Sequence, residues 1–168
     1  MRPSRTDAVV DELILAFSRV DAEALTDLLT WSAAAVTGVG YAGFVQVDPL
    51  GELARSVALH APRGDPLRVR AWLAESGVLK ELAACARPVV LPRDRSVGDP
   101  GFLAVPVPLA TREHAFLWVA GRDFDDVDGH LLGRFATAAA RALEAASGME
   151  AAIRLLRGVQ AFRATAGT

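Results

Sequence analysis

The sequence has very little cysteine: Cys85 is the single one in 168 residues. One cysteine cannot form an intramolecular disulfide, and it cannot supply a zinc or iron–sulfur site built from cysteines. This usage fits a reducing compartment, so we expect a cytoplasmic protein.

Long apolar runs and an excess of one charge are also missing. No run is long enough to span a bilayer, and Asp7, Asp11 and Glu12 interrupt the apolar positions after the basic first residues. We therefore expect no membrane partner. The net charge of −2 gives no whole-molecule field that would attract nucleic acid, so nucleic acid is not expected as a partner either.

The composition is that of one globular domain, and its central stretch is Gly101–Gly121. This stretch holds two apolar runs, Phe102–Leu109 and Ala115–Ala120, separated by a short polar segment. The alternation within each run predicts an antiparallel hairpin, and because both faces are apolar the hairpin should lie centrally in a covered sheet. Pro106 and Pro108 cannot donate to a ladder, so the first strand should be imperfectly paired on one side.

Hydrophobic periodicity, capping residues and breaks at proline and glycine predict the other elements. In chain order they are a helix over 6–20, a helix from the Asp21 N-cap to Gly38, strands over 41–47 and 53–59, short helices over 66–76 (opened by Pro66) and 78–86, a strand over 89–91, a loop over 92–100, a long closing helix, a break at Ser147-Gly148 and a helix over 149–162.

Apolar spacing predicts the buried face of each longer helix. On the second helix the predicted stripe is Leu25, Leu28, Leu29 and Val36. On the closing helix it is Leu131, Leu132, Phe135, Ala139, Ala142, Leu143 and Ala146. On the last helix Met149, Ile153, Leu156 and Val159 form an apolar stripe of a different kind, with no segment to pack on, and such an exposed stripe favours association.

Three stretches resemble parts of a GAF domain: Gly101–Val107 with the hairpin that follows, Phe124–Asp128 before the closing helix, and the turn over Val47–Leu53. The resemblance runs roughly from Asp21 to Ala146 and is closest to GAF domains of actinobacterial sensor kinases and regulators. It implies an α+β fold related to PAS domains, with a central antiparallel sheet of about five to six strands. N- and C-terminal helices would cover one face, and short helices and a loop would cover a pocket on the other.

The predicted division of the chain is an N-terminal helix over 1–20, a GAF-like domain over 21–146, and a C-terminal helical extension and tail over 147–168. No kinase, helix-turn-helix or RNA-binding segment is recognisable in the sequence. We therefore expect the output to come from a separate protein, such as a kinase or transcription regulator, or from a longer chain.

Cyclic-nucleotide-binding members of the GAF family are similar to one another in a motif that this chain matches only in part. Phe124 and Asp128 match, but Gly129 stands where those members have glutamate, and the chain has no asparagine. Haem-binding members place a histidine in the loop before the first hairpin strand, and residues 92–100 contain none.

No cofactor is therefore expected. Of the three histidines only His60, at the end of a predicted strand, is placed where haem iron could be bound, because His114 falls in a turn and His130 on the closing helix. A hydrogen-bonded histidine at a strand end is the simpler interpretation.

Catalytic motifs are equally sparse, so we expect a protein that is not an enzyme. Cys85 lies between two alanines, a setting that favours a small buried hydrophobe over a bilin-linked or reactive thiol. GAF-type methionine sulfoxide reductases use several cysteines. The acidic residues before the closing helix are explained by a helix N-terminus and predict no metal site; they are Asp123, Asp125, Asp126 and Asp128.

Two sets of residues remain as candidate sites. The first faces the pocket that the resemblance implies, with Arg63, Arg68, Arg93 and Arg95 near its mouth, and comprises Tyr41, His60, Trp72, Leu79, Phe102 and Trp118. The second is a set for homodimerisation through the terminal helices: Leu13, Phe17, Leu143, Ile153 and Leu156.

The hypothesis from the sequence is a non-catalytic regulatory domain that binds a small apolar or amphipathic molecule and signals through dimerising terminal helices. The alternative is a ligand-free dimerisation or protein-interaction module of the same fold, with its pocket filled by Trp72, Leu79 and Phe102.

Overall fold

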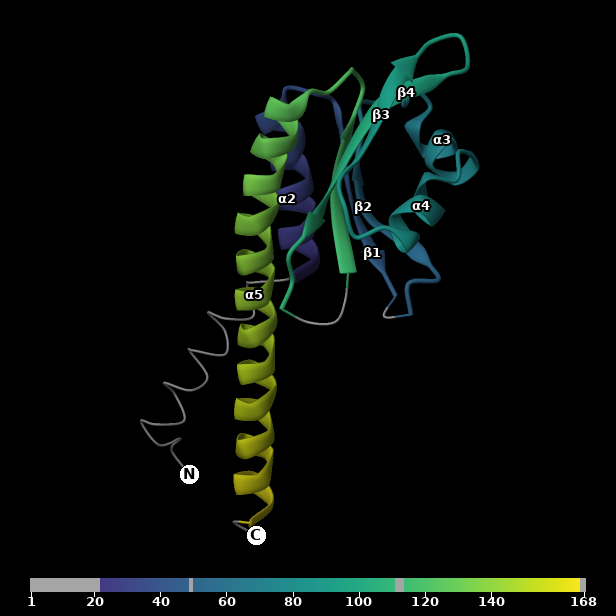
Figure 1. Ribbon diagram of the computed structural model, residues 1–168. Helices are drawn as coiled ribbons and strands as arrows, with labels where there is room; N and C mark the ends of the chain where they lie inside the picture. Colours follow the sequence, from purple (N-terminus) through teal and green to yellow (C-terminus); the bar gives the residue numbers. More distant parts are fainter. Residues whose placement is uncertain (1–21, 49, 111–113, 167–168) are drawn as a thin grey trace. The chain divides into compact units, whose positions relative to one another are not determined.

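The computed structural model describes residues 22–48, 50–110 and 114–166 (Figure 1). These residues divide into two compact units, one over 26–141 and the other containing 22–25 and 142–166. The predicted helix over 6–20, with Leu13 and Phe17, and the Asp21 cap lie outside the described residues. In chain order the elements are α2 (Ala22–Thr37), β1 (Tyr41–Val47), β2 (Ala54–His60), α3 (Val69–Glu75), α4 (Val78–Ala84), β3 (Val89–Asp94), β4 (Asp99–Val107), β5 (His114–Ala120) and α5 (Asp126–Ala166).

The predicted hairpin, β4 with β5, lies inside a five-stranded sheet of order β2-β1-β5-β4-β3. Every pair of neighbouring strands is antiparallel. Pro106 is opposite Phe116 of β5, whereas the ladder between β4 and β3 ends at Ala104. The imperfect pairing expected from the proline is thus confirmed, and it falls where the edge strand β3 has not yet begun.

Both faces of the sheet are covered, as the apolar hairpin predicted. Figure 1 shows α3 and α4 on one face of the sheet and, within the unit over 26–141, α2 and the first turns of α5 on the other. Phe102, Phe116 and Trp118 belong to a buried cluster with Val69 of α3 and Leu82 of α4. Strand neighbours of these residues point to the opposite face, since side chains alternate along a strand. The fold is α+β, as predicted.

Gly43 is needed in the centre of this sheet. It lies opposite Trp118 in the β1–β5 register, and a Cβ at this position would overlap the indole ring. Strand interiors usually disfavour glycine, but here the missing side chain lets the largest residue of the core lie flat on the neighbouring strand. Trp118 is fully buried as a result.

The prediction for the buried face of α2 was wrong. Leu28 is 56% exposed and Val36 45% exposed, while Leu25 and Leu29 are half-buried. The buried residues of α2 are small and they are Thr26, Thr30, Ala33, Ala34 and Thr37.

Hydrogen bonding explains how threonine can take the buried positions of α2. The hydroxyl of Thr30 donates to the carbonyl oxygen of Thr26 at 2.8 Å, and that of Thr37 donates to the carbonyl oxygen of Ala33 at 2.8 Å. A buried hydroxyl with an acceptor in its own helix carries no unsatisfied donor. Small side chains with satisfied hydroxyls therefore make up the buried face of α2.

The predicted loop over 92–100 is instead the end of a hairpin. β3 continues to Asp94, β4 begins at Asp99, and these two residues are paired in register. A short turn over 95–98 joins them. The carboxylate of Asp94 accepts hydrogen bonds from the amide and the hydroxyl of Ser96, at 2.9 and 2.6 Å, and these bonds lower the pKa of Asp94. The polar composition of this segment therefore belongs to a hairpin turn rather than to an open loop.

Pro66 does not open α3, which begins three residues later at Val69. The carboxylate of Asp65 determines this start, because it accepts hydrogen bonds from the amides of Val69 at 2.8 Å and Arg70 at 3.0 Å. These bonds lower the pKa of Asp65 although its burial acts in the opposite direction. Arg68, the residue before the helix, has a left-handed backbone with φ of 52°.

The break predicted at Ser147-Gly148 is also wrong, since α5 runs without interruption from Asp126 to Ala166. A single glycine costs a helix only about 1 kcal/mol relative to alanine and does not end it. Leu131, predicted to be buried, is 40% exposed, and the buried positions of α5 in the unit over 26–141 are Leu132, Ala136, Ala139 and Ala140. None of the described helices is sufficiently long and apolar to cross a membrane.

Candidate functional site

A surface cleft of about 550 Å³ lies between α3 and the hairpin formed by β3 and β4. Its α3 wall carries Arg68, Ala71, Trp72 and Glu75, and its hairpin wall carries Arg93, Arg95, Val97 and Asp99. The site is thus built from two segments that lie some twenty to thirty positions apart in the sequence, and the antiparallel pairing of β3 with β4 brings the second wall into place.

Trp72 joins the two walls. Its indole Nε1 donates to the carboxylate of Asp99 on β4 at 2.9 Å. Its ring packs on Phe102 with centroids 5.2 Å apart, and Phe102 in turn stacks on Trp118 at 5.6 Å. An aromatic chain therefore runs from the cleft into the core, and the hydrogen bond holds α3 against the hairpin.

The cleft is cationic. Within the described residues its charged lining consists of Arg68, Arg93 and Arg95 against Glu75 and Asp99. Asp99 already accepts the indole hydrogen bond. Neither Arg68 nor Arg95 forms an ion pair with any residue that the structure describes.

Arg93 differs from the other two arginines because it contacts the segment that leads into α5. Its guanidinium Nη1 donates to the carbonyl oxygen of Gly121 at 3.4 Å, and its backbone amide donates to the carboxylate of Asp123 at 2.7 Å. The cleft is therefore hydrogen-bonded, through one residue of β3, to the connection between β5 and α5.

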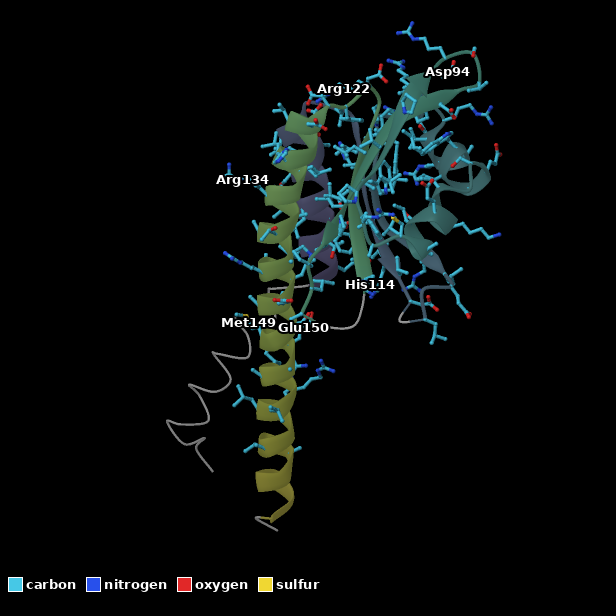
Figure 2. All side chains as sticks on the ribbon, viewed as in Figure 1. Asp94, His114, Arg122, Arg134, Met149 and Glu150 are labelled. Carbon is cyan, nitrogen blue, oxygen red and sulfur yellow. The ribbon has the colours of Figure 1, made fainter. Side chains whose placement is uncertain are left out.

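That connection is fixed by Arg122, which Figure 2 shows beside the first turn of α5. The guanidinium binds both carboxylate oxygens of Asp128 at 2.8 Å and donates to the carbonyl oxygen of Thr37, the last residue of α2, at 2.9 Å. It also lies 4.6 Å above the ring of Phe124. The Asp125 carboxylate accepts the backbone amide of Asp128 at 2.9 Å, and the Asp128 carboxylate accepts that of Asp125 at 3.0 Å, which forms a reciprocal cap on α5. We call Gly121–Asp128 with Thr37 the junction.

The charges of the junction stabilise one another. Hydrogen bonds from Arg122 lower the pKa of Asp128 to about 2, and the Asp128 carboxylate raises the pKa of Arg122. Both groups are therefore ionised at neutral pH.

Four residues predicted for the pocket lie in the core instead of lining the cleft. Tyr41 is 3% exposed, Phe102 and Trp118 are fully buried, and Leu79 packs against the same cluster. The Tyr41 hydroxyl accepts the amide of Leu67 at 2.9 Å, and burial raises its pKa. These side chains fill the space between the sheet and the short helices, where the sequence hypothesis expected a ligand.

Trp72, Arg93 and Arg95 do meet at the cleft, together with Arg68. His60 is half-buried at the end of β2 opposite Ala42, and Arg63 is exposed; neither lines the cleft. Sequence reasoning missed Glu75 and Asp99. Asp99 was missed because it lies in a different predicted segment from Trp72, its partner. No local pattern of residues connects the two.

Cys85 and the acidic residues before α5 do not meet in one site. Cys85 is half-buried, and its sulfur accepts the amide of Arg87 at 3.4 Å. In the part of the chain that the structure describes, no three histidine, cysteine, aspartate or glutamate side chains are grouped so that they could hold a metal ion.

The residues predicted for dimerisation are only partly placed. Ile153 is 6% exposed and Leu143 and Leu156 are half-buried within the single chain. The exposed apolar residues of this part of α5 are Leu155, at 73%, and Val159, at 53%. Homodimerisation remains a prediction.

Sequence comparison finds no matching family profile and no matching curated protein. Comparison of structures, by contrast, finds GAF domains. The second GAF domain of DevS from Mycobacterium smegmatis is 18% identical, with a TM-score of 0.56 over 77% of this chain and 98% of that one. The GAF domain of a protein assigned as a sensor histidine kinase in Pseudomonas syringae pv. tomato is also 18% identical, with a TM-score of 0.56 over 89% of this chain and 95% of the other.

An enzyme is among the similar structures. The free methionine-R-sulfoxide reductase from Neisseria meningitidis, solved with its substrate, is 16% identical, with a TM-score of 0.53 over 88% of this chain and 96% of that one. The chain therefore has the GAF fold, as the resemblance of its sequence predicted. Since that fold serves both regulatory domains and an enzyme, the function has to be argued from the site.

Proposed function

We propose that this protein is a non-catalytic regulatory domain that binds a small molecule in the cleft between α3 and the β3–β4 hairpin and transmits its occupancy to α5. The observation that carries the proposal is the double contact of Arg93. One residue both lines the cleft and hydrogen-bonds Gly121 and Asp123 of the junction.

The coupling follows from these contacts. A ligand bound to Arg93 would restrict the motion of its side chain and of the end of β3. Gly121 and Asp123 would be affected directly, because both are hydrogen-bonded to Arg93. Occupancy can shift an equilibrium at α5 only by the difference in affinity between two arrangements of the junction. A single hydrogen bond to a charged group, worth about 1.5–3 kcal/mol, is enough for a useful difference.

The lining of the cleft favours binding over catalysis. Among the described residues it contains no cysteine and no histidine, and the carboxylate of Asp99 is engaged by Trp72. A sulfoxide reductase would need reducing thiols at the site. We expect no methionine sulfoxide reductase activity in the wild type or in Cys85→Ala. Thiol-dependent turnover of a methionine sulfoxide would contradict this expectation.

Thermal denaturation with a panel of metabolites tests the binding step. A ligand at about 100 times its Kd stabilises the folded state by about 2.7 kcal/mol, which raises the Tm by several degrees. Native mass spectrometry of the purified protein would report a retained ligand and the oligomeric state in one measurement. A panel that leaves the Tm unchanged, with no retained ligand, would contradict the proposal.

Hydrogen exchange tests the transmission step. In the wild type, ligand should slow exchange at residues 121–130, and Asp123→Ala should abolish this effect while leaving the affinity nearly unchanged, because Asp123 does not line the cleft. Asp27→Ala is the matched control, since Asp27 is an exposed carboxylate on α2. Equal protection in Asp123→Ala and wild type would refute transmission through the hydrogen bond between Arg93 and Asp123.

A second candidate, a ligand-free dimerisation or protein-interaction module, is favoured by a different observation. Four of the pocket residues predicted from the sequence are packed into the core, and α2 exposes Leu28, Trp31 and Val36. On this proposal a homodimer or a separate output protein, such as a kinase or transcription regulator in the cytoplasm, would cover the exposed face. A Tm that rises with protein concentration, but not with any small molecule, would favour this candidate over the first.

A further inference from the structure

We propose that the ligand of the cleft is a small anion, in which a carboxylate or phosphate head group is attached to a planar apolar body. This inference rests on the proposed function and assigns the chemical class that the same site would select. It is argued from the arginines, from the aromatic wall and from the size of the cleft.

The three arginines line the cleft without an ion-pair partner among the described residues. Arg68 precedes α3, Arg93 lies on β3 and Arg95 lies in the hairpin turn, so three separate positions of the chain contribute to one cleft. Arg68 and Arg95 have no ion pair among the described residues, and Arg93 donates from its guanidinium only to a carbonyl oxygen. Like charges gathered in this way repel one another, and an anion between them would relieve the repulsion.

The two carboxylates do not neutralise this set. Asp99 accepts the indole hydrogen bond of Trp72 at 2.9 Å and Glu75 is exposed at the last turn of α3, and both carry a negative charge. The three arginines against these two acids leave the lining with one net positive charge. Guanidinium groups bind carboxylate and phosphate oxygens with two parallel hydrogen bonds, so arginine suits these head groups better than it suits chloride or a neutral amide.

The apolar part of the inference comes from Trp72. The ring lines the cleft while Phe102 supports it from the core at 5.2 Å, and Ala71 and Val97 are also in the lining. The indole orientation is fixed by the hydrogen bond to Asp99, so a planar body can pack against a ring that is already held in place. A cleft of about 550 Å³ is suited to a molecule of one or two fused rings with its head group.

Isothermal titration calorimetry of the full chain tests the class directly. The probes are 2-naphthoate, 2-naphthyl phosphate, the neutral isostere 2-naphthamide, and inorganic phosphate alone. We expect at least one charged naphthyl probe to bind tenfold or more tightly than naphthamide, and its affinity should fall as salt is added. The carboxylate and phosphate arms identify the preferred head group, and weaker binding of inorganic phosphate would establish the share of the planar body.

Paired variants show whether the arginines cause the preference. The double variant Arg68→Gln/Arg95→Gln should lose about tenfold or more in affinity for the charged probe and should bind naphthamide unchanged. The control Arg63→Gln/Arg87→Gln removes the same charge from exposed arginines outside the lining and should behave as the wild type. Circular dichroism would confirm that both variants are folded.

The outcomes separate this inference from the proposed function. Equal affinity for naphthoate, naphthyl phosphate and naphthamide, or an unchanged affinity in the Arg68→Gln/Arg95→Gln variant, overturns the anionic class and leaves a neutral ligand for the cleft. Binding of neither charged nor neutral probes, combined with an unresponsive metabolite panel, overturns both. If inorganic phosphate binds as tightly as naphthyl phosphate, the planar apolar body of the proposal is overturned and the anionic head group stands.

Discussion

The arginines of the cleft and the arginine of the junction occupy opposite environments in the same unit of the molecule. Arg122 has a bidentate carboxylate, two backbone carbonyls and an aromatic ring as partners, whereas Arg68 and Arg95 have no ion-pair partner among the described residues. The difference teaches that a charge fully satisfied within the chain stabilises the fold, while charges left unpaired in a cleft are available for a ligand.

The largest expected effect is at Gly101, which lets β4 approach the backbone of the junction. Its φ is 78°, and a Cβ there would overlap the carbonyl group of Arg122. Gly101→Ala should therefore lower the free energy of unfolding by roughly 3 kcal/mol or more, measured by urea denaturation.

Gly133→Ala is the control for that change. Gly133 lies inside α5, and a Cβ there would meet no atom within 4 Å. The substitution should stabilise the protein by about 0.5–1 kcal/mol through helix propensity. If Gly101→Ala were as stable as wild type, the close approach of β4 to the junction would be refuted.

Arg122→Gln should have the next largest effect. It removes the bidentate bond to Asp128 and the bond to the Thr37 carbonyl that ties α2 to the start of α5. Because the Arg122 side chain is 39% exposed, solvent screening reduces the loss to about 1–2 kcal/mol. Arg134→Gln, an exposed arginine of α5, should change the free energy of unfolding by less than about 0.5 kcal/mol; a similar loss in both variants would remove the distinction.

The junction should also make the free energy of unfolding depend on pH in the acid range. The pKa of Asp128 is about 2 in the folded protein against 3.8 for the unperturbed group, so the folded pKa is the lower one. Its contribution to stability is complete above about pH 4, where both states are ionised, and it is lost as the pH falls from about 4 to 2, because the unfolded state takes up its proton first.

Comparison with Asp128→Asn isolates this contribution, since other carboxylates with lowered pKa, such as Asp65 and Asp94, titrate in the same range. The stability difference between wild type and Asp128→Asn should shrink on acidification, with an amplitude of about 1–2 kcal/mol after allowance for screening. A difference that is constant between pH 5 and pH 2.5 would contradict the assigned role.

The smallest effect on stability should come from the cleft. Arg68→Gln/Arg95→Gln is expected to change the free energy of unfolding by less than about 0.5 kcal/mol, or to raise it slightly, because no ion pair is lost and mutual repulsion is relieved. Thermal denaturation without ligand measures this. A loss as large as that of Arg122→Gln would mean that the cleft arginines support the fold, and the contrast between the two regions would fail.

The sequence alone was sufficient for the hairpin of β4 and β5, its central place in the sheet and the GAF resemblance. Alternation and length along Phe102–Leu109 and Ala115–Ala120 report burial on both faces, and this is a local property of each strand. The sequence also brought Trp72, Arg93 and Arg95 into one candidate set, although the expectation came from the family's layout of elements rather than from any contact that spacing could establish.

The tertiary structure decided what periodicity could not. Leu28 and Thr30 each lie on a regular helical face, and only the packing of α2 in the folded unit selects the threonine face for burial. Whether Phe102 and Trp118 line a pocket or fill it depends on how closely α3 and α4 pack on the sheet, and Gly43 allows Trp118 to fill the space. The meeting of Trp72 with Asp99, and of Arg93 with Asp123, joins residues far apart in the chain. Such pairings depend on the three-dimensional path of the backbone, which no local pattern of residues encodes.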